Sequence, residues 1–160
     1  MSNGLKLAAP EGVPYIDAER EFDFPAAAVF AAHSDPEVFR QWIGPRELST
    51  RIDEFDCRSG GTYRFVQQGT DGREYAFRGV FHTVRDNAFI LQTFEYEGYP
   101  DLVTLEFSAF EDLPGGRCRL TGRSVYPRVE ARAKFLADGM EAGIAAGYQQ
   151  LDELLGDAGQ

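Results

Sequence analysis

The sequence predicts an α+β fold in which one curved antiparallel sheet wraps around a long C-terminal helix. Three features of the 160-residue chain support this prediction: a strand and two short helices near the N-terminus, a series of strands in the middle, and one long helical pattern at the end. A sheet with one apolar face must bury that face against another element. Only the last helix is long enough to cover it.

The first strand is expected over residues 16–24. Apolar and acidic side chains alternate along it, which is typical of a strand with one buried face. Ile16, Ala18, Phe22 and Phe24 form the apolar set, and Asp17, Glu19, Glu21 and Asp23 form the acidic set.

Two short helices are expected next. Pro25 suits the first turn of a helix over residues 26–32. Asp35 is suited to cap the second helix, and Pro36 suits its first position. Trp42, near the end of the second helix, has two interpretations that the sequence leaves open: a lid over a pocket, or an anchor in the core.

About six strands are expected between residues 47 and 125, separated by glycine-rich and Asp-Asn turn signals. Within residues 103–109, Leu105 and Phe107 alternate with polar residues that include Glu106. Because antiparallel sheets commonly have one buried and one solvated face, we expect Phe107 on the inner face and Glu106 on the solvated face. The carboxylates of Glu95 and Glu97 are expected on that solvated face too.

The last helix is expected over residues 129–155, with a length of about 40 Å. Gly139, Gly143 and Gly147 recur within it at intervals of four. Each glycine costs about 1 kcal/mol relative to alanine in a helix interior, so another requirement must favour small residues there. Two interpretations stay open: the glycines widen a pocket beneath the helix, or they permit close contact between the helix and the sheet.

Composition excludes several functions. The net charge of −10 disfavours nucleic-acid binding, which depends on clustered lysine and arginine. Cys57 and Cys118 are far apart, and no Cys or His lies at metal-ligand spacing, so we expect no metal, cofactor or disulfide. His33 and His82 have no partner that the sequence identifies, and no catalytic residue is predicted.

The chain lacks a secretory signal pattern and an apolar segment of about 18 residues, so we expect a cytoplasmic protein without membrane insertion. Residues 1–14, which contain Pro10, Gly12 and Pro14, are expected to form a flexible arm. Residues 15–157 are expected to form a single domain.

Four stretches resemble a known family: EREFDFPAAAVFAAHSDPEVFRQWIGP (19–45), CRSGGTYRF (57–65), DGREYAFRGVF (71–81) and GMEAGIAAGYQQLDELL (139–155). Together they resemble the activator of heat-shock protein 90 ATPase homologue-like family, within the START-like (SRPBCC) superfamily of helix-grip folds. The resemblance implies a deep apolar cavity between the sheet and the long helix, which the superfamily uses for lipids, hormones and polyketides. The chain departs from the family pattern at Ile43, where a second aromatic residue is common, and at Arg128, where a serine cap is common.

The aromatic inventory points to the same cavity, although core packing is the commoner role at any single position. Small-ligand pockets are concave and mostly apolar, with a few directed polar groups. We expect binding of a small hydrophobic or amphipathic molecule by Trp42, Tyr63, Phe65, Phe77, Phe81, Gln92, Phe94, Phe107, Met140, Gly143, Ile144, Gly147 and Tyr148.

Two alternatives use the same fold. The first is an enzyme of the cyclase or hydratase kind, which requires an ionisable side chain with a perturbed pKa facing the cavity. The residues favour a binding module because the sequence identifies no such side chain. The second is a cochaperone-like protein-interaction domain with a chaperone as partner. A homodimer through an open sheet edge is a further expectation that the sequence does not decide.

Overall fold

The computed structural model describes residues 3–158, which form one eight-stranded antiparallel sheet and four helices. The strand order across the sheet is β1-β2-β8-β7-β6-β5-β4-β3. In chain order, the elements are β1 (Lys6–Ala8), β2 (Tyr15–Phe22), α1 (Ala26–Ser34), α2 (Pro36–Trp42), β3 (Ser49–Phe55), β4 (Thr62–Gln68), β5 (Glu74–Arg85), β6 (Phe89–Tyr96), β7 (Thr104–Leu113), β8 (Arg117–Val125), α3 (Val129–Ala137) and α4 (Met140–Ala158). This arrangement confirms the predicted α+β class and the two short helices after the first long strand.

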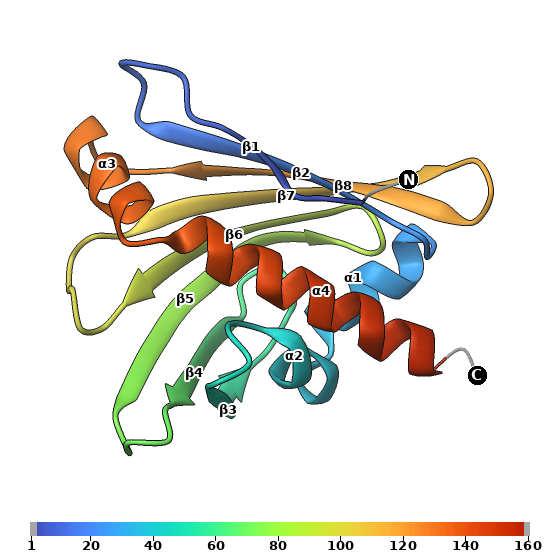
Figure 1. Cartoon of the computed structure of the whole chain (residues 1–160), viewed down its shortest axis with the longest axis horizontal. Helices are drawn as coiled ribbons and strands as arrows, with labels where there is room; N and C mark the ends of the chain where they lie inside the picture. The colour runs from blue at the N-terminus through green and yellow to red at the C-terminus, as the bar shows by residue number, and fades with distance from the viewer. Residues whose placement is uncertain (1–2, 159–160) are drawn as a thin grey trace.

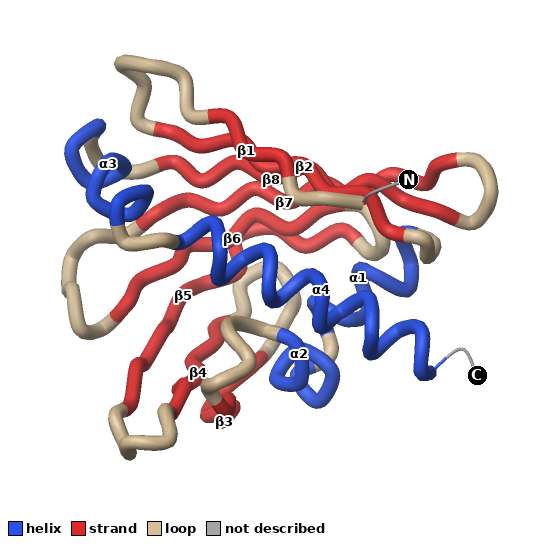
Figure 2. The backbone as a smooth tube through the Cα atoms, viewed as in Figure 1, coloured by secondary structure: helices blue, strands red, loops and turns tan. Residues whose placement is uncertain are grey.

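The sheet is strongly curved, and α4 crosses its concave side (Figure 1). We call the concave side the inner face and the opposite side the outer face. Helices α1 and α2 lie beside α4, whereas α3 lies beyond its N-terminal end (Figures 1 and 2). Helix α4 approaches α2 more closely than it approaches any strand. The inner face is therefore covered by α4 through side chains and not through close backbone contact.

The N-terminal segment corrects one prediction. Lys6–Ala8 form the edge strand β1, in which Leu7 pairs with Ala18 of β2, so this part of residues 1–14 is not a loose arm. The buried guanidinium of Arg132 in α3 also donates hydrogen bonds to the carbonyl oxygens of Pro10 and Tyr15. Residues 1–2 lie outside the described residues. The sheet edges are β1 and β3, and a homodimer through either edge stays a prediction.

The start of α2 follows its sequence signals. The carboxylate of Asp35 accepts a hydrogen bond from the backbone N–H of Glu37 at 2.9 Å, which satisfies one of the free donors of the first turn. Pro36 occupies the first helical position, where its missing N–H leaves no bond unmade. These contacts fix α2 beside α1 and hold Trp42 against the inner face.

The single helix expected over residues 129–155 is two helices. Gly139 has a φ of +80°, a left-handed conformation, directly after α3 and its C-cap residue Asp138. Helix α4 begins at the next residue, Met140, and it is the long helix of the fold. Gly139 therefore serves a turn between two helices and is not a residue of a helix interior.

The apolar core is divided into two clusters. The main cluster lies between the sheet, α1, α2 and the C-terminal half of α4, and it includes Phe22, Trp42 and Leu151. The second cluster lies at the other end of the sheet near α3 and includes Ile16 and Tyr126.

Candidate functional site

A row of polar side chains crosses the inner face between the two clusters. The strand register places Gln92 of β6, Glu106 of β7 and Ser124 of β8 directly opposite one another, with Ile16 of β2 at the end of the row. Directly opposed residues of an antiparallel sheet share a face. The adjacent row along the strands holds mainly small side chains and consists of Ile90, Ser108, Gly122 and Ala18.

Helix α4 is anchored on either side of these rows. At one end, the hydroxyl of Tyr126 donates to the sulfur of Met140 at 3.4 Å in the second cluster. Near the middle of α4, the ring of Tyr148 packs edge-on against Phe22, with centroids 5.5 Å apart. Ile144 lies midway between these anchors, keeps part of its surface exposed, and belongs to neither cluster of the described residues. Apolar packing between α4 and the sheet is thus interrupted at Ile144.

A wall of stacked aromatic rings borders this interruption on the β4–β6 side. Phe77 stacks on Phe65 and on Phe94, with centroid distances of 5.2 and 5.3 Å. Tyr63 and Phe81 continue the wall at a centroid distance of 5.0 Å. All five side chains lie on the inner face, where the sequence pattern placed them. Phe77 and Phe94 are only partly buried. Contact of these rings with a ligand stays a prediction.

Glu106 is the acidic group of the inner face. Its carboxylate oxygens accept hydrogen bonds from the hydroxyl of Thr104 at 2.6 Å and from the hydroxyl of Ser124 at 2.7 Å. Burial raises the pKa of Glu106 to about 7, although the two hydroxyl bonds favour the charged form. The side chain keeps some exposed surface despite its depth among protein atoms. Partial exposure together with a deep position among protein atoms is expected of a carboxyl group that faces an interior space.

A buried ion pair joins the helix to the sheet next to this row. The guanidinium of Arg20 on β2 donates to both carboxylate oxygens of Asp152 on α4, at 3.1 and 2.7 Å. The same guanidinium lies over the ring of Phe22, 4.6 Å from its centroid. Two parallel bonds fix the distance and the orientation between α4 and the sheet. Arg20 is therefore already paired and is not free to bind an anion.

Trp42 is a core anchor. Its side chain is buried, and its indole N–H donates to the carbonyl of Ala32 at 2.9 Å. Its ring stacks on Tyr148 at a centroid distance of 6.0 Å and also packs against His33. Burial lowers the pKa of His33 to about 4, and its Nδ1–H donates to the carbonyl of Val29. These contacts favour the core interpretation of Trp42 over the lid.

Gly143 and Gly147, the predicted site glycines that lie within α4, have different surroundings. A Cβ atom on Gly147 would lie 3.2 Å from the carbonyl oxygen of Trp42, so this glycine permits close contact between α4 and the end of α2. The amide of Gln150 secures the same contact by donating to the carbonyl of Gly44 at 2.7 Å. A Cβ on Gly143 would meet open space. Gly147 therefore does permit a close contact, but with the end of α2 and not with the sheet as expected, whereas Gly143 leaves room beside the helix.

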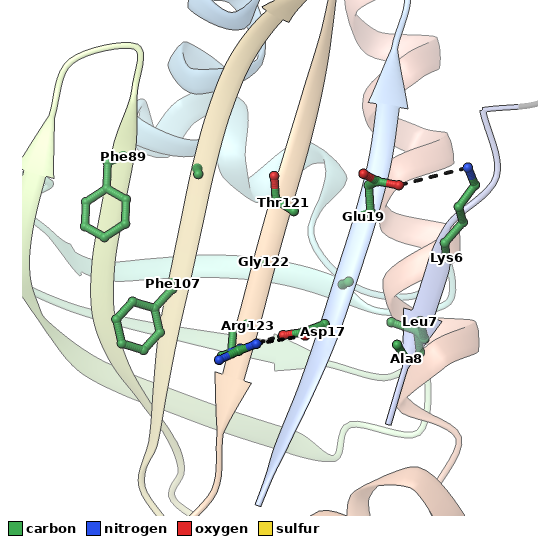
Figure 3. Close-up of a pocket in the computed structure, with 12 residues that line it drawn as sticks. Lys6, Leu7, Ala8, Asp17, Glu19, Phe89, Phe107, Thr121, Gly122 and Arg123 are labelled. Atoms are coloured by element: carbon green, nitrogen blue, oxygen red, sulfur yellow. Dashed lines mark hydrogen bonds and ion pairs between the residues drawn. The ribbon is translucent and has the colours of Figure 1, made fainter. Parts of the chain in front are cut away.

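The faces of β7 correct two further predictions. Phe107 lies on the outer face, where it lines a shallow groove of about 430 Å³ with Phe89, Arg123 and the β1 strand. Figure 3 shows the rings of Phe89 and Phe107 on this outer surface, beside the ion pair between Arg123 and Asp17. Phe107 therefore does not belong to the inner-face site, and Glu106, expected on the solvated face, does.

The sequence of β7 is ambiguous about which of its two faces is buried. Leu105 and Phe107 suggest one inward face for β7, but Phe110 has the opposite phase, and it is Phe110 that is buried. Cross-strand pairing resolves the ambiguity, because Phe110 pairs with the buried Leu120 of β8. The same pairing places Glu106 opposite Ser124. The acid was missed because a single strand does not reveal which of its two apolar sets faces the core.

Among residues 3–158, none of the helices is long and apolar enough to span a membrane. No three His, Cys, Asp or Glu side chains of these residues gather in a way that could hold a metal ion.

Comparison with known proteins agrees with the fold. The sequence profile of a family described as "Activator of Hsp90 ATPase homolog 1-like protein" matches residues 23–156. A Rhodobacter sphaeroides crystal structure has a TM-score of 0.85 at 22% identity, covering 96% of this chain and 98% of that chain. A solution structure from Arthrobacter aurescens has a TM-score of 0.87 at 23% identity, with 95% and 91% covered. No curated protein matches the chain.

A third similar structure, the AHSA1 protein of Silicibacter pomeroyi, has a TM-score of 0.71 at 22% identity and covers 89% of this chain and 97% of its own. At these identities the structural likeness establishes the fold alone, and it confirms the expected helix-grip arrangement of a curved sheet and a long C-terminal helix. The profile match covers most of the sequence. The chain therefore belongs to the Activator of Hsp90 ATPase homolog 1-like family.

Proposed function

We propose that this protein binds a small apolar or amphipathic molecule between the inner face of the sheet and α4. Three observations support the proposal: Ile144 belongs to neither apolar cluster, small residues such as Ser108 and Ala18 form a row of the inner face, and the rings of Phe77 and Phe94 on that face are only partly buried. Removing apolar ligand surface from water contributes about 25 cal/mol per Å². Gln92 and Glu106 supply the polar groups that would orient the guest.

An enzyme of the cyclase or hydratase kind is a second candidate, and one observation favours it. Glu106 meets the requirement for an ionisable interior group with a perturbed pKa. Mass spectrometry of a molecule before and after binding separates the two functions. A carrier returns the molecule unchanged, whereas an enzyme alters its mass or its structure. The cochaperone-like alternative has no comparable observation in its favour.

The binding proposal is tested with the neutral fluorescent dye N-phenyl-1-naphthylamine and a matched pair of variants. Ser108→Leu adds a large side chain to the small row of the inner face, and we expect dye affinity to fall at least about tenfold, or about 1.4 kcal/mol. Ala109→Leu makes the same addition on the outer face and should leave dye affinity unchanged.

Unfolding in urea shows whether both variants keep the native fold. Equal dye affinity in the wild type and in a folded Ser108→Leu protein would contradict a site on the inner face.

A further inference from the structure

Glu106 is a partly buried carboxylate that forms no ion pair with residues 3–158. Thr104 and Ser124 donate to its two oxygens, and no arginine or lysine of residues 3–158 contributes to its pKa. Other carboxyl groups with shifted pKa values, such as Asp17 and Glu97, have them lowered by hydrogen bonds to arginine. An interior anion that lacks a countercharge is costly, so its presence needs an explanation.

Three arginines of the sheet within residues 3–158 are already paired with other carboxylates. Arg20, the arginine of the inner face, is held by both oxygens of Asp152. Arg78 and Arg123 bind Glu95 and Asp17 on the outer face. The titratable groups that face Glu106 are Tyr63 from β4, Tyr126 after β8 and Tyr148 from α4. Burial raises the pKa of each of these phenols, so all three are neutral near pH 7.

The surroundings of Glu106 suit an organic cation. A protonated amine would satisfy the carboxylate in a low-dielectric site, where paired charges attract more strongly than in water. The aromatic wall next to Glu106 exposes ring surface of Phe77 and Phe94, and aromatic faces attract cations. The Tyr148 hydroxyl forms no hydrogen bond with the described residues and can accept one from the same head group.

We propose that the molecule bound between the sheet and α4 is an amphipathic amine, whose ammonium group pairs with Glu106 and whose apolar part lies against the aromatic wall. This inference rests on the proposed function and specifies its ligand class. In this proposal Glu106 selects the head group of the ligand. The apolar surface supplies affinity for any hydrocarbon part of suitable size.

The test compares 1-octylamine with 1-octanol as competitors of the bound dye, at pH 8 and 150 mM salt. We expect the wild type to bind the amine at least about tenfold more tightly, because only the amine can form a buried ion pair. Glu106→Gln should remove this preference and retain octanol binding. Glu111→Gln, an exposed outer-face change on the same strand, should keep the preference. It thereby controls for weak attraction of the amine to the acidic surface.

A pH series on the wild type tests the same inference without a variant. Between pH 8 and pH 5.5 the affinity for 1-octylamine should fall as Glu106, with its pKa of about 7, takes up a proton. Affinity for 1-octanol should change little. Equal affinity for the two competitors, or a preference that survives Glu106→Gln, would overturn the amine assignment and leave the ligand site intact. Binding of neither competitor, together with no dye binding, would overturn both proposals.

Discussion

Glu106 and His33 are interior groups whose protonation links stability to pH below neutrality, and they act in opposite directions. The folded state raises the pKa of Glu106 from 4.5 to about 7, so folded protein binds more protons and loses stability as the pH rises through that window. The folded state lowers the pKa of His33 from 6.5 to about 4, so its contribution to stability is lost as the pH falls through that window. Between pH 4.5 and 6.5 the two contributions largely cancel.

Glu106→Gln removes one of these contributions and should reveal the other. Relative to the wild type, we expect the variant to gain stability as the pH rises from 4.5 to 7, by at most about 3 kcal/mol. The measurement is the free energy of urea unfolding of both proteins at several pH values. A constant difference between them across this range would show that Glu106 is not buried in the folded state.

At the residue scale, the sequence predicted which residues belong to the sheet better than it predicted the face on which each side chain lies. Tyr63, Phe65 and Phe77 lie on the inner face as their alternation indicated. Phe107 and Glu106 were assigned to the wrong faces because β7 carries apolar residues in both phases. Which phase is buried depends on pairing with β8, and this information is not contained in the strand itself.

The α3–α4 segment shows how three equally spaced glycines can serve three structural purposes. Gly139 ends α3 in a left-handed conformation, Gly143 borders open space, and Gly147 lies against the backbone at the end of α2. Periodicity predicted that this segment is helical and that Met140, Ile144 and Tyr148 lie on the side that faces the sheet. It did not predict the break, because a glycine at a helix end and a glycine inside a helix look alike in sequence.

Alanine substitutions distinguish these purposes. We expect Gly143→Ala to stabilise the protein by about 1 kcal/mol, because alanine is the better helix former and nothing obstructs its methyl group. Gly139→Ala should destabilise by about 1 kcal/mol, because its φ is positive. Gly147→Ala should gain less than Gly143→Ala, because its methyl group meets the Trp42 carbonyl oxygen at 3.2 Å.

Urea unfolding of the three variants gives the comparison directly. The same stability gain at positions 143 and 147 would argue against close packing of α4 on α2. A gain at Gly139 would argue against the helix break.

On the scale of the whole molecule, two apolar clusters lie at opposite ends of the inner face. The short helices and Trp42 complete one cluster, and α3 with Tyr126 completes the other. The ion pair between Arg20 and Asp152 fixes α4 across the sheet. The sequence predicted the order of elements and the covering helix, but the division of the core emerges only when strand register and helix position are known.

The central claim is that a guest lies between the inner face and α4. Intermolecular nuclear Overhauser effects between bound N-phenyl-1-naphthylamine and protein methyl groups test it most directly. We predict contacts to the inner-face methyls of Ala18, Ile90 and Ile144. Contacts confined to Leu7 and Ala109 would place the dye in the outer groove and contradict this claim.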